Sequence, residues 1–148
     1  MIKLFVSDTN ALISYFHEVF KVRHNFSDKA MQIFDCALST SNDKIKLSIP
    51  SVVFIEIFEK WFLTEEFVKK FFYEVFTPLI ESPNIEIKPI EKEVLENLIN
   101  IRGSLANHEI NDKIILASAM MLNCPLITND QSIIDYVNEN SVIPSIIN

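Results

Sequence analysis

The sequence predicts an α/β fold built on a mostly parallel β-sheet. Short apolar runs that suit buried strands alternate with longer segments in which apolar residues recur at helical spacing. The segments between the expected strands are too long for hairpins and suit right-handed crossovers. No linker, repeat or low-complexity segment interrupts the alternation, so residues 1–148 are expected to form a single domain.

Five strands are expected, each a short run rich in apolar and β-branched residues. They are placed at residues 2–6, 45–49, 85–87, 125–128 and 142–147. The first run, Ile2 to Val6, offers no polar side chain beyond Lys3 and is interpreted as a buried strand. Pro50 ends the second run, because proline cannot continue a hydrogen-bonded ladder.

The helices are expected where apolar residues are three or four positions apart. They are placed at residues 9–17, 27–39, 51–62, 64–80, 91–101, 112–123 and 132–138. Ser27 and Ser51 are expected to cap the second and third of them. Residues 112–123 are apolar nearly all round, which predicts a buried helix, and residues 103–111 are expected to form a loop.

Composition excludes several classes of protein. The single glycine, Gly103, argues against a phosphate-binding loop or a dinucleotide fingerprint, since both need several glycines. Cys36 and Cys124 are far apart and are expected to be free thiols in a reducing compartment. The N-terminus lacks the pattern of a signal peptide, and no apolar run approaches the ~20 residues that cross a bilayer. A cytoplasmic protein without membrane contact is therefore expected.

The net charge of −7 arises entirely from the second part of the chain. Residues 1–60 carry seven basic and seven acidic groups, whereas residues 61–148 carry six basic and thirteen acidic groups. Such a chain binds nucleic acid poorly through general charge attraction. Any role on nucleic acid must depend on a local site, or on metal ions that reverse the sign of an acidic cleft.

Two expected strands end in the same pattern. Asp8 and Asn10 follow the first strand, while Thr128 ends the strand at 125–128 and Asp130 comes just after it. In an open parallel sheet the carboxyl ends of adjacent strands border one crevice, where ligands collect. These side chains are therefore expected to lie close together.

Two further acids are candidates for the same crevice. Glu56 is three and four residues from Val53 and Val52, which places it on or beside a buried helix face. Asp112 is at the start of the most apolar helix. Carboxylates gathered in one cleft repel one another, and a hard divalent cation such as Mg²⁺ or Mn²⁺ removes that penalty. Such a site can activate water against a phosphodiester.

Each acid also has an ordinary structural explanation. Asp8 and Asp130 could simply cap the helices that follow them. Glu56 could be a solvated acid at the edge of its helix, and Asp112 a first-turn acid favoured by the helix dipole. The functional interpretation depends on all four occurring together, each at an element boundary or a buried face.

The ordered set of motifs resembles the PIN domain family over residues 2–147. The motifs are VSDTN, then a serine followed five positions later by Glu56, then NDKIILASA, then LITND. The resemblance implies a three-layer α/β/α domain with a five-stranded sheet, Mg²⁺ or Mn²⁺, RNA cleavage, homodimers and, for the many VapC-type toxins of the family, an antitoxin partner. Carried over residue by residue, the acidic quartet is Asp8, Glu56, Asp112 and Asp130, supported by the polar side chains of Asn10 and Thr128.

Four residues outside the quartet are candidates for substrate contact. Lys21 and Arg23 belong to a compact basic cluster, His108 is four residues before Asp112, and Lys113 follows Asp112 directly. The simpler interpretation of His108 is a surface loop histidine, and a solvated loop explains the basic cluster equally well.

Residues 54–76 contain nine of the sixteen aromatic side chains. One helix pair cannot turn all of them into a single core, so they predict either a thick aromatic core or a surface covered by a partner. The second alternative is tested by aspartate at Phe67 and Phe71, which should then change assembly or solubility.

Two rival functions remain at this stage. An aspartate-nucleophile phosphatase would use Asp8 but usually needs a second acid two residues later, where this chain has Asn10. A catalytically weak PIN-like module for binding or assembly would cleave no RNA in any divalent ion.

Overall fold

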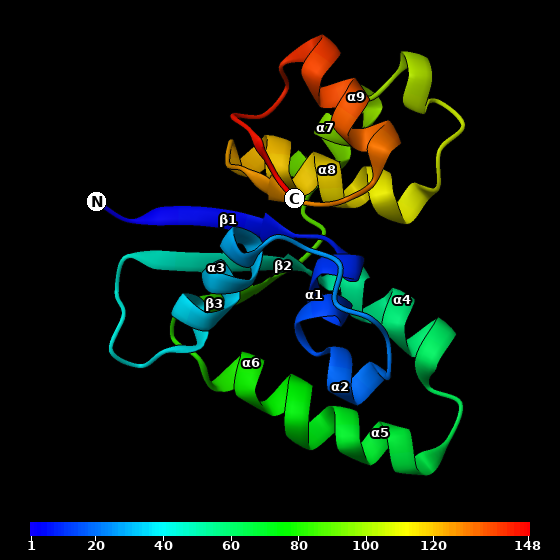
Figure 1. The fold of residues 1–148 in the computed structure, drawn as a ribbon. Helices are drawn as coiled ribbons and strands as arrows, with labels where there is room; N and C mark the ends of the chain where they lie inside the picture. Colours follow the sequence, from blue (N-terminus) through cyan, green and yellow to red (C-terminus); the bar gives the residue numbers. More distant parts are fainter.

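The computed structural model describes residues 1–148 and contains a five-stranded sheet in the order β3-β2-β1-β4-β5 (Figure 1). All four strand pairs are parallel. Helices flank the sheet in a three-layer α/β/α arrangement, as predicted. The strands are β1 (Lys3–Ser7), β2 (Ile45–Pro50), β3 (Ile85–Lys88), β4 (Leu126–Ile127) and β5 (Ile146–Ile147).

The central strand β1 is where the strand order reverses. The chain moves from β1 to β2 and β3 on one side, then crosses back to place β4 and β5 on the other. Phe5 is paired with Leu47 of β2, and Ser7 with Ile127 of β4. The adjacent carboxyl ends of β1 and β4 therefore form the switch point at which open α/β sheets bind their ligands.

The helices pack on both sides of the sheet. Figure 1 shows α7, α8 and α9 together on one side of β1 and β2, and α5 and α6 on the other. The elements are α1 (Thr9–Tyr15), α2 (His17–Phe20), α3 (Asp28–Leu38), α4 (Ser51–Trp61), α5 (Glu65–Phe71), a π-helical turn (Phe72–Phe76), α6 (Thr77–Glu81), α7 (Lys92–Ile99), a 3₁₀ turn (Gly103–Leu105), α8 (Ile110–Leu122) and α9 (Gln131–Asn140). None of them is both long and apolar enough to cross a membrane.

Several local predictions were wrong. The helix expected at 9–17 breaks at Phe16, whose φ of −95° and ψ of 37° leave the helical region. Ser51 does not cap α4, because Pro50 still pairs with Lys88 in the sheet and the helix begins directly after it. Ile2 is 60% exposed, and only the second half of β1 is buried.

The second half of the chain also departs from the prediction at element ends. The α8 helix begins at Ile110, two residues earlier than expected, and part of the preceding loop is a 3₁₀ turn. The last strand is limited to two residues. The prediction that α8 is buried is confirmed, since Leu116, Ala117 and Ala119 are fully buried.

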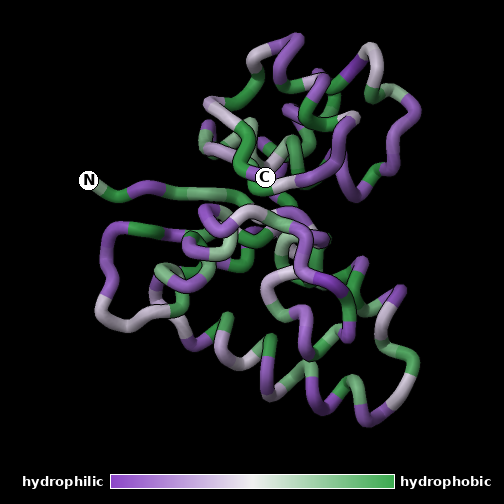
Figure 2. Tube along the Cα trace, viewed as in Figure 1, coloured by the Kyte–Doolittle hydropathy of each residue, from purple (hydrophilic) through white to green (hydrophobic).

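The aromatic segment is mainly core. Phe71 is 2% exposed, and its ring centroid is 5.4 Å from that of Phe62 and 6.1 Å from that of Phe20. Figure 2 shows hydrophobic and hydrophilic stretches alternating along the rod that runs from α5 to α6. Phe72 and Tyr73 point outward, at 48% and 70% exposed. The proposed aspartate test at Phe71 would therefore disrupt the core rather than probe a surface.

Truncation at Phe71 is expected to destabilise the protein far more than truncation at Tyr73. Phe71→Ala should lower the free energy of unfolding by about 3–5 kcal/mol, because it leaves a cavity among well-packed rings. Tyr73→Ala removes an exposed ring and should change it by roughly 0.5 kcal/mol or less. Urea unfolding of both variants checks the difference. Equal losses would show that the rod does not pack as described.

Candidate active site

The two aspartates that follow β1 and β4 both begin helices. Asp8 caps α1 by accepting a hydrogen bond at Oδ1 from the backbone N–H of Ala11 (2.7 Å). Asp130 caps α9 in the same way, because its Oδ1 accepts a hydrogen bond from the backbone N–H of Ile133 (3.2 Å). Capping therefore does occur, but it uses one oxygen of each carboxylate. The helix caps leave the second oxygen of each carboxylate unused.

Asp112 and His108 join Asp130 from the other side of this crevice. Asp112 is in the first turn of α8, and His108 is in the loop that precedes that helix. The Nε2 atom of His108 is 3.1 Å from Oδ2 of Asp112 and 3.1 Å from Oδ2 of Asp130. The interpretation of His108 as a plain surface histidine was therefore wrong.

Asp8, Asp112, Thr128 and Asp130 line one small cavity together with apolar side chains from β4, α8 and α9. Burial is the main reason why the pKa of Asp8 is raised to about 7, and the charges of Asp112 and Asp130 raise this pKa further. Hydrogen bonds from Thr128 and Ala11 oppose the shift because they stabilise the ionised carboxylate. Burial likewise raises the pKa of Asp112, and repulsion from Asp130 and Glu56 adds to this effect. The site is thus a cluster of carboxylates that resists carrying its full negative charge.

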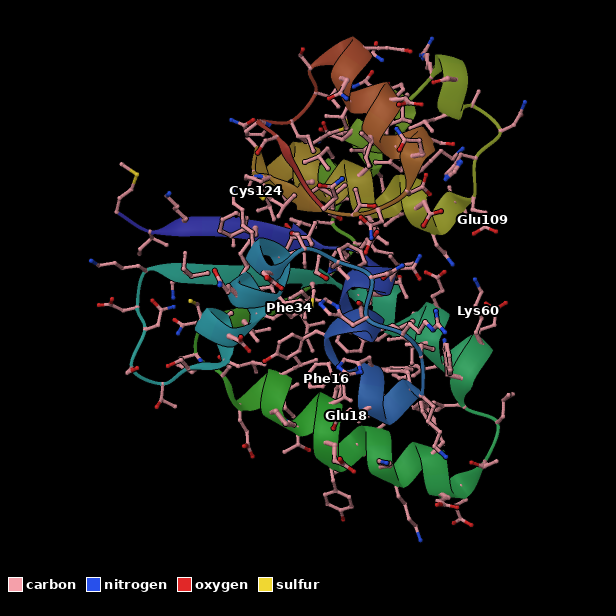
Figure 3. The ribbon with its side chains drawn as sticks, in the orientation of Figure 1. Phe16, Glu18, Phe34, Lys60, Glu109 and Cys124 are labelled. Atoms are coloured by element: carbon pink, nitrogen blue, oxygen red, sulfur yellow. The ribbon has the colours of Figure 1, made fainter.

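Glu56 is buried beside this cluster but already has partners. Its Oε1 accepts a hydrogen bond from the Thr9 hydroxyl (2.6 Å), and its Oε2 accepts one from Lys60 Nζ (3.1 Å). This contact with Glu56 raises the pKa of Lys60, and the charges of Glu109 and Asp112 act in the same direction. Figure 3 shows Lys60 on α4 and Glu109 before α8 on the same side of the molecule.

Glu56 also borders a second cavity of about 370 Å³. Besides apolar side chains, its lining includes Asn10, Arg23, Lys60 and Trp61. This cavity brings two cations and an aromatic ring beside Glu56, in a chain that is acidic as a whole.

The predicted supporting and substrate residues take different positions. Thr128 is fully buried, and its Oγ1 accepts a hydrogen bond from the backbone N–H of Asp130 (3.1 Å). Asn10 is exposed and lines the second cavity without bonding a carboxylate. Lys21 is the exposed left-handed residue that ends α2, outside both cavities. The Nζ atom of Lys113 donates to the Ala106 carbonyl (3.2 Å).

Sequence reasoning missed the roles of Thr9 and Lys60. Lys60 is four residues after Glu56, a spacing at which helical side chains of opposite charge meet, so the sequence did contain a signal for this pair. The Thr9 contact joins residues 47 positions apart and had no local signal.

The donor set fits a hard divalent cation. The cluster offers carboxylate oxygens, which Mg²⁺ and Mn²⁺ prefer. Such an ion would offset the burial and the charge repulsion that together raise the pKa of Asp8 and Asp112. Asp8, Asp112 and Asp130 line one cavity, and Asp112, Asp130 and His108 offer ligand atoms that all lie within 4.8 Å of one another.

Comparison with known proteins identifies the class. The sequence model of the PIN domain matches residues 5–139. The chain belongs to the PIN domain family, and the resemblance seen in the sequence is confirmed.

Solved toxin–antitoxin structures share this fold. A chain of VapBC2 from Rickettsia felis, bound to a DNA fragment from its promoter, has a TM-score of 0.63 at 16% identity, with 98% of this chain and 99% of that chain covered. A chain of DNA-bound VapBC from Salmonella typhimurium has a TM-score of 0.63 at 16% sequence identity, with 98% of this chain and 97% of that chain covered. A chain of FitAcB from Neisseria gonorrhoeae has a TM-score of 0.63 at 15% sequence identity, with 97% of this chain and 96% of that chain covered. No curated protein matches the chain in sequence.

Proposed function

We propose that the protein is a divalent-metal-dependent endoribonuclease and the toxin of a toxin–antitoxin pair, acting as one domain over residues 1–148. The observation that carries the proposal is the convergence of Asp8, Asp112 and Asp130 at the switch point between β1 and β4. Family membership supports a nuclease rather than an aspartate-nucleophile phosphatase, and Asn10 occupies the position where the phosphatase needs its second acid.

Each residue of the site has a distinct task in this proposal. Asp8, Asp112 and Asp130 would hold Mg²⁺ or Mn²⁺, which when bound supplies an activated water and Lewis-acid stabilisation of the phosphoryl oxygens. Thr128 fixes Asp8 and Asp130 by hydrogen bonds. Glu56, held by Thr9 and Lys60 in the wall of the second cavity, would orient the attacking water.

The second cavity is the proposed entrance for RNA. Arg23 and Lys60 attract a phosphate, and the Trp61 ring offers a surface on which an unpaired base can stack. Local cations of this kind are needed because the net charge of −7 gives no general attraction to nucleic acid. His108 and Lys113 act on the substrate only indirectly, through the acid cluster and the loop that they fasten.

The partner proposals follow from the toxin–antitoxin structures that share the fold. An antitoxin and a second copy of the chain are the expected partners. Apolar side chains that remain exposed on α4, between α4 and α5, and directly after α5 offer them a surface, namely Ile55, Phe58, Leu63, Phe72 and Tyr73. RNA as substrate places the activity in the cytoplasm. A small open reading frame for a DNA-binding protein directly upstream would support the toxin role.

The function is tested by incubating the purified protein with a mixture of structured RNAs in Mg²⁺, in Mn²⁺ and in EDTA. Discrete fragments are expected with either ion and none with EDTA, because the carboxylate cluster alone repels the phosphodiester. Absence of cleavage in every divalent ion would contradict the proposal and favour a binding module. A trapped aspartyl-phosphate on Asp8 would contradict it in favour of the phosphatase.

A further inference from the structure

We propose that His108 is a nitrogen ligand of the divalent ion and that it makes this site prefer Mn²⁺ to Mg²⁺. The inference rests on the proposed metal site and adds a donor that the acidic quartet does not contain. It concerns which ion acts at this site.

The distances around His108 match those between neighbouring ligands of one ion. Its Nε2 atom is 3.1 Å from an oxygen of Asp112 and 3.1 Å from an oxygen of Asp130, and all three ligand atoms lie within 4.8 Å of one another. Two ligands at right angles on an ion with bonds of about 2.1 Å are roughly 3.0 Å apart. The imidazole would therefore serve as a ligand of an ion held by Asp112 and Asp130 without any change in the loop.

The loop that carries His108 is fastened at several points. The backbone N–H of His108 donates to the carbonyl of Leu105 (3.0 Å), whose side chain is fully buried. Lys113 Nζ donates to the carbonyl of Ala106 (3.2 Å), which ties the loop to the first turns of α8. His108 is thus held over the acids by the fold itself, while 22% of its side chain remains exposed.

The chemistry of imidazole explains the expected selectivity. Mg²⁺ prefers oxygen ligands and dehydrates reluctantly, so a nitrogen donor contributes little to its binding. Transition ions accept imidazole more readily, and a mixed set of one nitrogen and several carboxylate oxygens shifts the preference towards them. The alternative is that His108 serves only as a counter-ion for Asp112 and Asp130 and leaves when a metal arrives.

Electron spin echo spectroscopy of the Mn²⁺-loaded protein distinguishes these roles. The chain has only three histidines, and neither His17 nor His24 is in the acidic cluster. We expect ¹⁴N modulation from a directly bound nitrogen, replaced by the ¹⁵N pattern when the full chain carries ¹⁵N-histidine. This comparison needs no substitution and so does not depend on the folding of a variant.

Two variants and a matched control complete the test. His108→Gln should abolish the modulation and weaken Mn²⁺ binding about tenfold, while Mg²⁺ binding, measured by competition, changes less than about threefold. His108→Asn should behave in the same way, and His24→Gln should match the wild type in both measurements.

The outcomes separate the inference from the proposed function. Mn²⁺ that binds without nitrogen modulation, or an unchanged Mn²⁺/Mg²⁺ ratio in both His108 variants, would overturn the role of His108 and leave the carboxylate site in place. Failure of the wild type to bind Mn²⁺ at millimolar concentration would overturn the metal site itself.

Discussion

Asp8→Asn is expected to lower the rate of divalent-dependent RNA cleavage by about a thousandfold, equivalent to roughly 4 kcal/mol of transition-state stabilisation. Asp8 is the most buried carboxylate of the cluster, at 8% exposed, and is close enough to Asp112 and Asp130 for their charges to raise its pKa. Asparagine keeps the oxygen that accepts the N–H of Ala11, so the cap of α1 and the fold should survive. The measurement is the single-turnover rate on one RNA in Mn²⁺, with circular dichroism of the same preparation.

Asp28→Asn is the matched control for this substitution. Asp28, like Asp8, is an acid at the start of a helix, but it is the exposed first residue of α3, where Ser27 supplies the cap. Its cleavage rate should remain within about twofold of the wild type. An Asp8→Asn protein that cleaves at nearly the wild-type rate would remove Asp8 from the mechanism.

The sequence predicted the acids at the strand ends because parallel topology makes that position a consequence of chain order. Once β1 and β4 are neighbours, Asp8 and Asp130 must emerge at the same edge. Local sequence also sufficed for the helix-capping role of both residues. Neither conclusion required knowledge of side-chain packing.

The parts of the site that the sequence did not reveal depend on helix rotation and on contacts between distant segments. With Asp8 as the cap, Thr9 becomes the first helical residue and turns towards Glu56, whereas Asn10 is rotated by a further ~100° and faces solvent. His108 reaches two acids from a loop, and one of them is 22 positions away. Spacing within a single segment cannot predict such contacts.

A contact between distant segments also explains why Ser51 does not cap α4. A serine after a strand-ending proline suits a helix start, but the ladder between β2 and β3 continues through Pro50, which pairs with Lys88. The strand therefore runs directly into α4, and Ser51 is already helical. This abrupt junction fixes the direction of α4 from its first residue and so helps to place Glu56.

The metal-free protein is expected to lose stability as the pH rises from 5 to 8. Burial raises the pKa of Asp8 to about 7, so between its unfolded value near 4 and pH 7 the folded state binds a proton that the unfolded state has released. The free energy of unfolding therefore falls across this window, by about 2–3 kcal/mol from this one group between pH 5 and 8. The raised pKa of Asp112 acts in the same direction.

Urea unfolding in EDTA at pH 5 and pH 8 measures this loss, and Asp8→Asn isolates the contribution of one carboxyl. The variant should show a much flatter dependence and should exceed the wild type in stability at pH 8, because its side chain cannot ionise. Adding Mn²⁺ at a hundred times its dissociation constant should return about 2.7 kcal/mol to the wild type at pH 8. Two outcomes would contradict this prediction: a wild-type stability that is constant or rises from pH 5 to 8, or an Asp8→Asn variant whose stability depends on pH as steeply as that of the wild type. Either would show that Asp8 is not held in the buried, repulsive environment from which its role in metal binding is inferred.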